Sequence, residues 1–581
     1  MAEEERTAFI PTHDGDHIFP ADPLFTRLLT IANRPTQRIA IRDLNAGIEK
    51  TIAELLGDVL NLRRILKSSL TASALQDVQD GKEVFISILA PGGYEFAVGM
   101  FACLALGFAA SAISIVMPVG EATYYVQKAR SVGVLAATTS LDLGRGLEKV
   151  IRSSSNPDFV CLPINSFQGS PSISPNDMLI SSNRYQDPNS ASLIIFTSGT
   201  SGPPKAAVLR RSSISDGAMS FMEQINIREG DVLQHLLPVH HATGIWVSFF
   251  PFLLAGACIE FKPGSFDPKW CWERWRQGGI THFTGVPTIY MRMMRYYQEH
   301  LTKLPPQELQ AYNKAAADLR VLICGTSALP QPINEFWTKT RGGRKIVQRY
   351  GATETGVVFN MPTYENDDVP DGSVGEPTLG VDVKLSDGNE GEVLMKSFNM
   401  FSKYLHDPEA TKKAHNEEGY YKTGDVARKE GKYYFIMGRS SIDILKSGGY
   451  KISALDVERE LLALPYIAEA MVVGVPDDEF GERVGAVVSL RTDKLAQDFF
   501  KETGRSPTQL SLDDMRSDVR SRLAGYKLPT ILRVVQGEIP KGGTGKVVKK
   551  ILGPQFFPPT YQGDPEVQVW SSARKEPKAK L

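Results

Sequence analysis

Short, almost wholly apolar segments alternate with longer amphipathic stretches between about residues 80 and 348 of this 581-residue chain. Strands that are apolar along their whole length are buried on both faces, and when they alternate with helices they form parallel sheets covered by those helices. The segments expected to be strands are FISILA (85–90), ASAISIV (110–116), GVLAAT (133–138), FVCLPI (159–164), SLIIFT (192–197), ACIEF (257–261), ITHFT (280–284), RVLIC (320–324) and KIVQ (345–348). The pattern predicts an α/β fold with a large N-terminal domain of stacked, mostly parallel sheets.

After about Gly438 the pattern changes to a smaller set of helices and strands. Capping residues at Ser453 and Ser511 each predict the start of a helix, the second ending at Gly525. Three strands are expected between and after them, EAMVVGV (469–475), VGAVVSL (484–490) and TILRVVQ (530–536). We therefore expect a large domain over residues 1–437, a small mobile α+β domain over residues 438–553, and a tail over residues 554–581.

One uncharged segment, Phe96–Met117, is long enough to cross a bilayer. The alternative is a buried, alanine-rich helix, a turn at Gly107 and a buried strand, which would complete a β-α-β unit. We favour the alternative and expect no membrane span. The N-terminal residues are acidic and lack the apolar run of a signal peptide.

Charge and cysteine content exclude several classes of function. Lys and Arg number 65 and Asp and Glu 66, so no net field favours nucleic acid. The five cysteines are scattered and form no C-x-x-C pair, which argues against a disulfide framework or a zinc site. The last three residues, Ala579-Lys580-Leu581, are similar to a peroxisomal address that an import receptor would read. A chance match would leave the protein cytoplasmic.

Two glycine-rich segments could hold phosphate groups. FTSGTSGPPK (196–205) directly follows an expected strand and combines hydroxyls, glycines and Lys205, which suits a phosphate cradle, although a plain polar loop is the alternative. PKGGTGK (540–546) presents Lys546 on a loop able to move into a site formed elsewhere. Neither segment satisfies the Walker pattern. We expect Lys541, Lys549 and Lys550 nearby to be solvated.

Together with YGATE (350–354), CGTSALP (324–330), YKTGD (421–425) and GRSS (438–441), these segments identify the chain as a member of the superfamily of acyl-CoA synthetases, peptide-synthetase adenylation domains and firefly luciferase. The resemblance covers residues 80–553. GRSSIDILKSGGYKISALDVE (438–458) and VVGVPDDEFGERVGAVV (472–488) most resemble the malonyl-CoA synthetase-like branch. The resemblance implies an AMP-forming ligase that converts ATP, a carboxylic acid and coenzyme A into acyl-CoA, AMP and pyrophosphate through an acyl-adenylate.

The resemblance also implies roles for individual residues. The residues expected to hold the β- and γ-phosphates are Thr197, Ser198, Thr200 and Lys205. The residues expected around the adenine are Gly325, Thr326, Ser327, Tyr350 and Gly351. Asp425 and Arg439 would bind the ribose, Thr353 the α-phosphate, and Glu354 Mg²⁺. Lys546 would contact the reacting carboxylate. Taken singly, Asp425 or Glu354 would more often be a solvated carboxylate.

The same resemblance extends to the acyl and CoA sites. His241 would lie at the mouth of the acyl pocket, with Trp246 and Phe249 along it, although a tryptophan is as easily a core residue. Arg292 would bind the second carboxylate of malonate, or it is a surface charge on an amphipathic helix. Residues Lys446, Gly448 and Gly449 would meet CoA after the small domain turns about a hinge, placed at Ser441 in a stretch one residue longer than the family pattern.

We favour a short dicarboxylate such as malonate as the acid. A medium-chain, aryl or secondary-metabolite acid in the peroxisome is an alternative. A stand-alone module that loads a carrier protein, a luciferase-like oxygenase and a non-catalytic nucleotide-binding protein are further alternatives. The retention of Lys205, Glu354, Asp425 and Lys546 together argues against the last of these.

Overall fold

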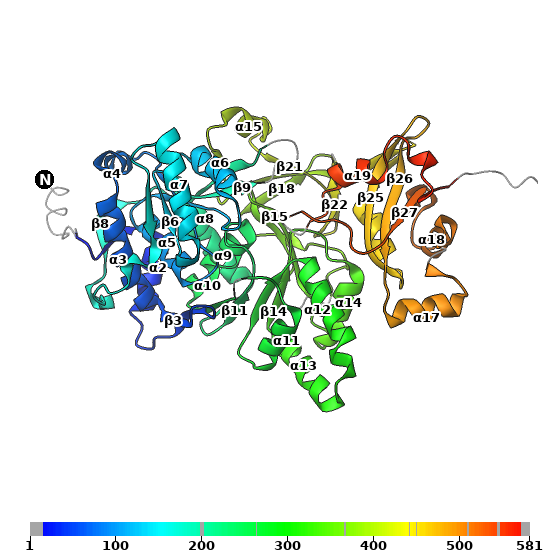
Figure 1. Cartoon of the computed structure of the whole chain (residues 1–581), viewed down its shortest axis with the longest axis horizontal. Coiled ribbons are helices and arrows are strands. Elements are labelled where there is room, and N and C mark those ends of the chain that lie inside the picture. The colour runs from blue at the N-terminus through cyan, green and yellow to red at the C-terminus, as the bar shows by residue number, and fades with distance from the viewer. Residues whose placement is uncertain are drawn as a thin grey trace, which may run out of the picture.

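The computed structural model has the α/β architecture expected from the sequence, with two large sheets in the N-terminal part and a smaller unit at the C-terminal end (Figure 1). The structure describes residues 15–197, 203–262, 264–364, 368–440, 442–448, 450–507, 510–542 and 546–570. Elements β25, β26 and β27 of the C-terminal unit lie at the opposite end of the molecule from the N-terminal helices α2 and α3. This arrangement matches the predicted fold class.

The first large sheet contains five of the expected strands and places Lys205 near its edge. In the described part of the chain its order is β20 (Lys403–Tyr404), β10 (Lys205–Arg210), β9 (Ala191–Thr197), β5 (Ala109–Ala112), β4 (Phe85–Leu89), β6 (Gly133–Ala136) and β7 (Val160–Pro163). The strands from β9 to β7 are parallel, whereas β10 folds back antiparallel to β9. The apolar runs are buried on both faces because helices cover both sides of a parallel sheet.

The second large sheet carries the other expected strands of the N-terminal domain. Its order over the described residues is β17 (Glu376–Pro377), β16 (Gly356–Asn360), β15 (Val347–Ala352), β14 (Val321–Cys324), β13 (His282–Gly285), β11 (Val232–His235), β12 (Cys258–Phe261), β2 (Ile39–Asp43) and β3 (Ile48–Thr51). Its inner strands are parallel. Consequently, the chain segments that follow β14 and β15, where the sequence predicts adenine contacts, meet at one edge of the sheet.

Two smaller sheets complete the N-terminal part. One joins β18 (Val381–Leu385), β19 (Glu390–Ser397), β21 (Tyr421–Glu430) and β22 (Tyr433–Arg439), all antiparallel. The other pairs β1 (Ile18–Ala21) with β8 (Leu179–Tyr185). The register of β21 against β22 sets Asp425 opposite Arg439, which brings these two predicted ribose contacts together.

Helices cover the large sheets, and α3 (Ile52–Ser69) begins with side-chain capping. The Thr51 side chain accepts a hydrogen bond from Glu54 N while the Glu54 side chain bonds back to the Thr51 backbone, a full capping box. The helices of this part are α2 (Pro23–Ala32), α3 (Ile52–Ser69), α4 (Ala72–Gln79), α5 (Tyr94–Ala105), α6 (Val119–Ala129), α7 (Leu141–Ser154), α8 (Arg211–Ile214), α9 (Asp216–Gln224), α10 (Phe250–Ala255), α11 (Pro268–Arg276), α12 (Pro287–Glu299), α13 (Pro306–Asp318), α14 (Gln331–Thr340) and α15 (Pro408–Lys413).

The uncharged segment Phe96–Met117 is not one continuous helix. Helix α5 ends at Ala105, Gly107 adopts the left-handed backbone with a φ of +86°, and strand β5 follows at Ala109–Ala112. Both elements are buried in the N-terminal core. Among the described helices, none is long and apolar enough to cross a bilayer.

The C-terminal unit has hydrophobic clusters of its own, built around residues such as Val457, Val472, Val488 and Met515. Its elements are β23 (Ile444–Ser447), β24 (Tyr450–Ser453), α16 (Ala454–Leu462), β25 (Ile467–Asp477), β26 (Gly481–Leu490), α17 (Lys494–Thr503), α18 (Leu512–Val519), β27 (Ile531–Val535), α19 (Lys549–Phe556) and β28 (Val567–Val569). Ser511 caps α18 with a capping box, as expected, but the helix ends at Val519 rather than Gly525.

The expected tail over residues 554–581 is wrong for its first part. Helix α19 continues to Phe556, and β28 pairs with β27 as an additional strand. Phe557, Tyr561 and Val567 are buried against the sheet, which explains why this segment folds rather than remaining solvated. The expected boundary at residue 437 falls inside β22, and its position remains a prediction.

Candidate active site

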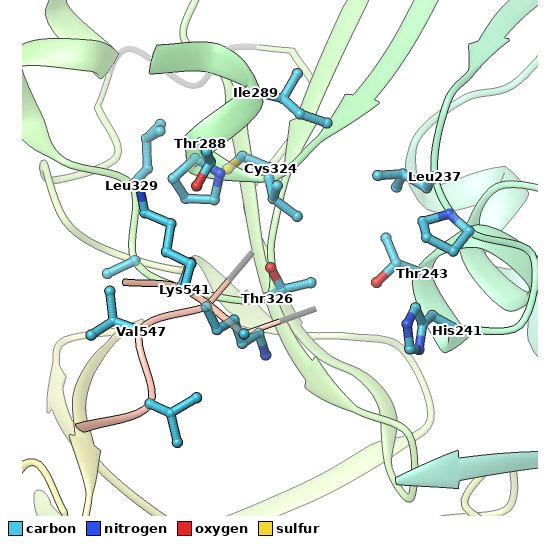
Figure 2. A pocket seen from close by; sticks show the side chains of 18 of the residues that line it. Leu237, His241, Thr243, Thr288, Ile289, Cys324, Thr326, Leu329, Lys541 and Val547 are labelled. Carbon is cyan, nitrogen blue, oxygen red and sulfur yellow. The ribbon is translucent and has the colours of Figure 1, made fainter. Parts of the chain in front are cut away.

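A single large cleft of about 2990 Å³ lies between the N-terminal sheets and the C-terminal unit. In Figure 2, Leu237, Thr243 and His241 come from one side of the pocket and Lys541 and Val547 from the C-terminal segment on another side. The sequence-predicted residues that line this cleft are Thr197, Lys205, His241, Trp246, Thr326, Ser327, Tyr350, Gly351, Thr353, Glu354, Asp425, Arg439 and Lys546. Residues far apart in the sequence therefore share one cavity.

Lys205 begins β10 and stands directly opposite Thr197 of β9 in the antiparallel pair. The loop between these strands thus begins and ends at the cleft. Ser198 and Thr200, also predicted to hold phosphate, lie outside the described residues. Lys205 Nζ lies 4.9 Å from the centre of the Tyr404 ring, a distance suited to a cation–π contact.

Glu354 is buried beside the Lys205 wall of the cleft. Tyr404 donates a hydrogen bond of 2.8 Å from its hydroxyl to Glu354 Oε1, and its hydroxyl lies 3.3 Å from that of Tyr421. Burial raises the pKa of Tyr404 and Tyr421, and the negative charge of Glu354 adds to the effect. The carboxylate is therefore held by one neutral donor, Tyr404, and it can still accept further bonds.

Tyr350, Asp425 and Arg439 form a connected group that also lines the cleft. The Tyr350 hydroxyl donates to Asp425 Oδ2 at 2.6 Å, and Arg439 Nε donates to Asp425 Oδ1 at 3.1 Å. Burial raises the pKa of Asp425, while the positive charge of Arg439 and the bond from Tyr350 act in the opposite direction. A carboxylate fixed between a phenol and a guanidinium is well placed to accept bonds from vicinal hydroxyls of a sugar.

Two backbone features shape the adenine side of the cleft. A Cβ atom on Gly351 would lie 2.0 Å from the carbonyl oxygen of Gly356, so only glycine fits the turn of the Tyr-Gly-x-Thr-Glu segment. Thr326 adopts a left-handed φ of +73°, which is unusual for a β-branched residue. Strained backbone of this kind gathers at ligand sites, and Thr326 points into the pocket in Figure 2.

Lys546 reaches the cleft from the C-terminal unit. It lies close enough to His241 for its charge to lower the pKa of that imidazole, an effect smaller than that of burial. Partial removal from water and the positive charge of Arg439 lower the pKa of Lys546, and Asp425 opposes them. Lys546 and Lys205, distant in the sequence, therefore lie on the walls of the same cavity.

The residues predicted for the acyl pocket have mixed outcomes. Trp246 is 7% exposed, donates from Nε1 to the Ser213 carbonyl at 2.7 Å, and also lines the cleft, so it is both a core and a wall residue. Phe249 is wholly buried among other aromatic rings and does not line the cleft.

The structure does not bring Arg292 into the cleft, and its binding role remains a prediction. Its side chain is exposed and stacks on Phe266, with Cζ 5.1 Å from the ring centre, and it does not line the cleft. Arg292 lies on the same face of α12 as Thr288 and Arg295, which line the cleft, but its side chain turns onto Phe266 instead. The alternative of a surface charge is the one that the structure supports.

Two of the residues predicted to meet CoA, Lys446 and Gly448, do not line the cleft. Lys446 is exposed on β23, and Gly448 has a left-handed φ of +54° in the turn that follows. Neither lines the cavity that holds Lys546. Gly449 and the predicted hinge, Ser441, are outside the described residues.

The expectation that Lys541 and Lys549 are solvated is wrong. Lys541 donates to Glu469 and, at 3.3 Å, to Glu538. Lys549 is largely buried and forms ion pairs of 2.6 Å with Asp443 and 2.7 Å with Glu458. The sequence did not reveal these ion pairs, because Glu469, Asp443 and Glu458 are distant in sequence from the two lysines and their glycine-rich segment.

Glu354 is the residue that the sequence predicts to bind Mg²⁺. No group of three or more His, Cys, Asp or Glu side chains arranged to hold a metal occurs among the residues that the structure describes. Mg²⁺ bound with nucleotides commonly uses one or two carboxylates plus phosphate oxygens and water. Glu354, with its single bond from Tyr404, fits the role of one such carboxylate.

Comparison with known proteins agrees with this geometry. A family model described as AMP-binding enzyme matches residues 32–405, and one described as the C-terminal domain of AMP-binding enzymes matches residues 456–546. An acyl-CoA ligase of Aspergillus oryzae is 31% identical over 93% of this chain and 93% of that protein. A malonate–CoA ligase of Arabidopsis thaliana is 31% identical over 93% of this chain and 90% of that protein.

A solved structure, ATP-bound MatB from Rhodopseudomonas palustris, has the same fold. It superposes with a TM-score of 0.75 at 23% identity, covering 92% of this chain and 99% of that one. The family models cover most of the chain, and the relatives extend over nearly all of it. The chain therefore belongs to the AMP-binding enzyme family, and it is a ligase.

Proposed function

We propose that this chain is an AMP-forming acid–CoA ligase that acts on a short dicarboxylic acid such as malonate. The ligase chemistry is supported above all by one observation, the meeting of Lys205, Lys546 and the Asp425–Arg439 pair in a single cleft. The positive charges of Lys205 and Lys546 in one cavity would attract a triphosphate, and the fixed Asp425 carboxylate would accept hydrogen bonds from the ribose hydroxyls of the same nucleotide. The relatives that are CoA ligases support the same reaction.

In the proposed first step the acid carboxylate attacks the α-phosphorus of ATP, and pyrophosphate leaves. No enzyme nucleophile is needed, because the anhydride forms directly between the two substrates. Lys205, with Thr197, Ser198 and Thr200, would hold the departing phosphates. Lys546 and Thr353 would neutralise charge at the α-phosphate, and Tyr350 with Gly325, Thr326, Ser327 and Gly351 would bind the adenine. Alignment and charge neutralisation then supply the catalysis.

Mg²⁺ bound with ATP would further neutralise the phosphate charge, with Glu354 as its protein carboxylate. Glu354 is held by Tyr404, whose ring also meets the Lys205 ammonium group. The cradle lysine and the metal-binding carboxylate are thus linked through one tyrosine. Such a link would keep their separation constant as the phosphates enter and leave.

In the proposed second step the CoA thiol attacks the acyl carbon and AMP leaves. Lys546 occupies the neighbourhood that the thiol must enter, so the C-terminal unit would have to turn. Lys446, Gly448 and Gly449 would then meet the pantetheine arm, with the hinge at or near Ser441. The present exposure of Lys446 and Gly448 outside the cleft is consistent with this two-position model.

The malonate–CoA ligases of Arabidopsis thaliana and mouse among the relatives support a dicarboxylic substrate. Trp246 on the wall of the cleft would limit the depth available to a long acyl chain. Arg292 no longer supports this proposal. A medium-chain, aryl or secondary-metabolite acid is the second candidate, favoured by the size of the cleft and by the Aspergillus acyl-CoA ligase.

We expect acid-dependent release of pyrophosphate that is highest with malonate in a panel that also contains octanoate and benzoate. The measurement is made with and without CoA, and malonyl-CoA is identified by mass spectrometry. Turnover of octanoate or benzoate but not malonate would exclude the dicarboxylate and favour the second candidate. Pyrophosphate release without any CoA product would favour a module that loads a separate carrier protein.

We also propose that the protein is directed to the peroxisome by Ala579-Lys580-Leu581, with a cytoplasmic location as the alternative. These residues lie outside the described part of the chain, and the proposal rests on the tripeptide alone. A fluorescent protein fused to the N-terminus should mark peroxisomes, and removal of the last three residues should release it to the cytoplasm. An unchanged location after this deletion would contradict the proposal.

A further inference from the structure

An arginine side chain is buried in strand β15 without a partner. Arg349 pairs through its backbone with Asn360 of β16, and its side chain is only 8% exposed. Its Nε and Nη2 atoms are buried and have no hydrogen-bond partner among the described residues. A buried charge without a counter-charge is unfavourable, and proteins retain one chiefly where a ligand supplies the missing partner.

The guanidinium of Arg349 lies directly against the backbone of Gly325. A Cβ atom on Gly325 would stand 3.2 Å from Arg349 Cγ and 3.3 Å from Cζ, so the absence of a side chain there lets the arginine pass. Gly325 is flanked by Cys324 and Thr326, which both lie on the pocket wall in Figure 2. Arg349 itself is one of the residues that line the cleft.

The groups around this cation are neutral or positive. The Cys324 thiol and the Tyr290 hydroxyl lie nearby, and burial raises the pKa of both, so both are uncharged at neutral pH. No carboxylate of the described residues forms an ion pair with Arg349. Burial lowers the pKa of Arg349 to about 10, which still leaves it positively charged at neutral pH.

Apolar side chains share the neighbouring part of the pocket with the hydroxyls of Thr288 and Thr326. Ile289 and Leu329 extend into the same view as Cys324. An aliphatic acid would find apolar contact here, but its chain would leave the guanidinium without a partner. A carboxylate would supply two acceptor oxygens that match the planar fork of an arginine.

We propose that Arg349 binds the carboxylate of the dicarboxylic substrate that is not adenylated, the role expected from the sequence for Arg292. This inference rests on the proposed function, because it assigns the substrate class of that same site. One carboxylate would lie at Lys546 for adenylation, and the other would lie beside Gly325 on Arg349. A site built around an unpaired buried group rejects analogues that cannot complete it, so Arg349 would set the preference for diacids.

The test compares malonate with 3-methylbutanoate, in which an isopropyl group replaces the second carboxylate at similar size. Arg349→Met removes the charge and keeps most of the volume. We expect it to lower kcat/KM for pyrophosphate release with malonate by about tenfold to a hundredfold, the range for a charged hydrogen bond. The value for 3-methylbutanoate should remain unchanged or rise, because an apolar side chain then faces an apolar substituent.

Arg292→Met serves as the matched control and should leave the ratio between the two acids unchanged. Arg349→Lys keeps the charge but loses the fork, and it provides a second variant should the methionine protein not fold. It should lower malonate use while leaving 3-methylbutanoate use unchanged. An equal loss with both acids in the Arg349 variants would assign the residue a structural role and overturn the inference.

The two levels of the proposal fail in different ways. If the unaltered enzyme uses malonate but Arg349→Met keeps its preference for malonate, the inference about Arg349 fails and the proposed function stands. If the unaltered enzyme releases pyrophosphate with 3-methylbutanoate or other monoacids but never with a diacid, the dicarboxylate function itself fails, and the inference fails with it.

Discussion

Replacing Lys546 with alanine is expected to lower the rate of adenylate formation by about 10²–10³-fold, the range for losing one fixed group that stabilises a transition state. The same variant should transfer a supplied acyl-adenylate to CoA at nearly the normal rate. The reason is positional. Lys546 lies in the cleft beside His241 and the Asp425–Arg439 pair, where charge develops only when pyrophosphate leaves.

The two half-reactions are measured separately, the first by pyrophosphate release without CoA and the second by acyl-CoA formation from synthetic malonyl-adenylate. Lys541→Ala is the matched control because Lys541 belongs to the same segment and lines the same cleft, but is paired with Glu469. It should affect adenylation far less. An equal loss of both half-reactions in Lys546→Ala would show that the lysine does not act in the first step alone.

The positions of the strands along the large domain could be predicted because the signal is local. Each buried strand of a parallel sheet is apolar throughout, so FISIL or VLIC identifies itself without knowledge of its neighbours. The segment Phe96–Met117 was resolved by the same logic, since Gly107 supplies the left-handed turn between α5 and β5. Motif order then located the cleft residues, because each motif follows a strand or lies on a loop between strands.

The misplaced residues depend on contacts across the fold. Arg292 follows a Val-Pro-Thr segment and lies on the face of α12 that meets the cleft, but its contact with Phe266, which the sequence does not indicate, turns its side chain away. Lys549 looked solvated because Asp443 and Glu458 are distant in sequence. Residues 554–570 lack an obvious strand pattern, yet β28 adds to the sheet edge.

Arg349 did leave a signal that the sequence analysis missed. The segment KIVQRYG places an arginine directly after the expected strand KIVQ, and the structure extends that strand through Arg349 to Ala352, between β16 and β14. A charged residue at such a position is almost never buried without a partner. A charged residue next to an expected buried strand suggests that a ligand supplies its partner, and the arginine at this place in the sequence was visible before the structure was known.

Lys549→Met should destabilise the C-terminal unit by about 3–5 kcal/mol, the cost of leaving buried charges without their partner. Lys549 ties Asp443, just after β22, to Glu458 of α16, and all three side chains are largely buried. Glu458 also accepts a bond of 2.6 Å from Val472 N, so the three charges hold the entry to the unit against β25. A loss of this size is a large part of the stability of a small domain.

Hydrogen exchange of the β25 and β26 amides, followed by mass spectrometry, reports on this unit separately from the larger domain. Lys501→Met, at an exposed position on α17, shows what the loss of a solvated lysine costs in the same unit. Adenylation should also fall in Lys549→Met, because the anchor lies three residues after Lys546 and fixes the end of its loop.

The double variant Lys549→Met with Glu458→Gln separates loss of charge balance from loss of packing. It removes one positive and one negative charge together, and therefore should be more stable than Lys549→Met alone although it carries more changes. If Lys549 stabilised the unit mainly by packing of its aliphatic side chain, Glu458→Gln would lower the stability of the double variant further. The buried triad would then contribute through packing, and the anchoring of Lys546 by paired charges would have to be abandoned.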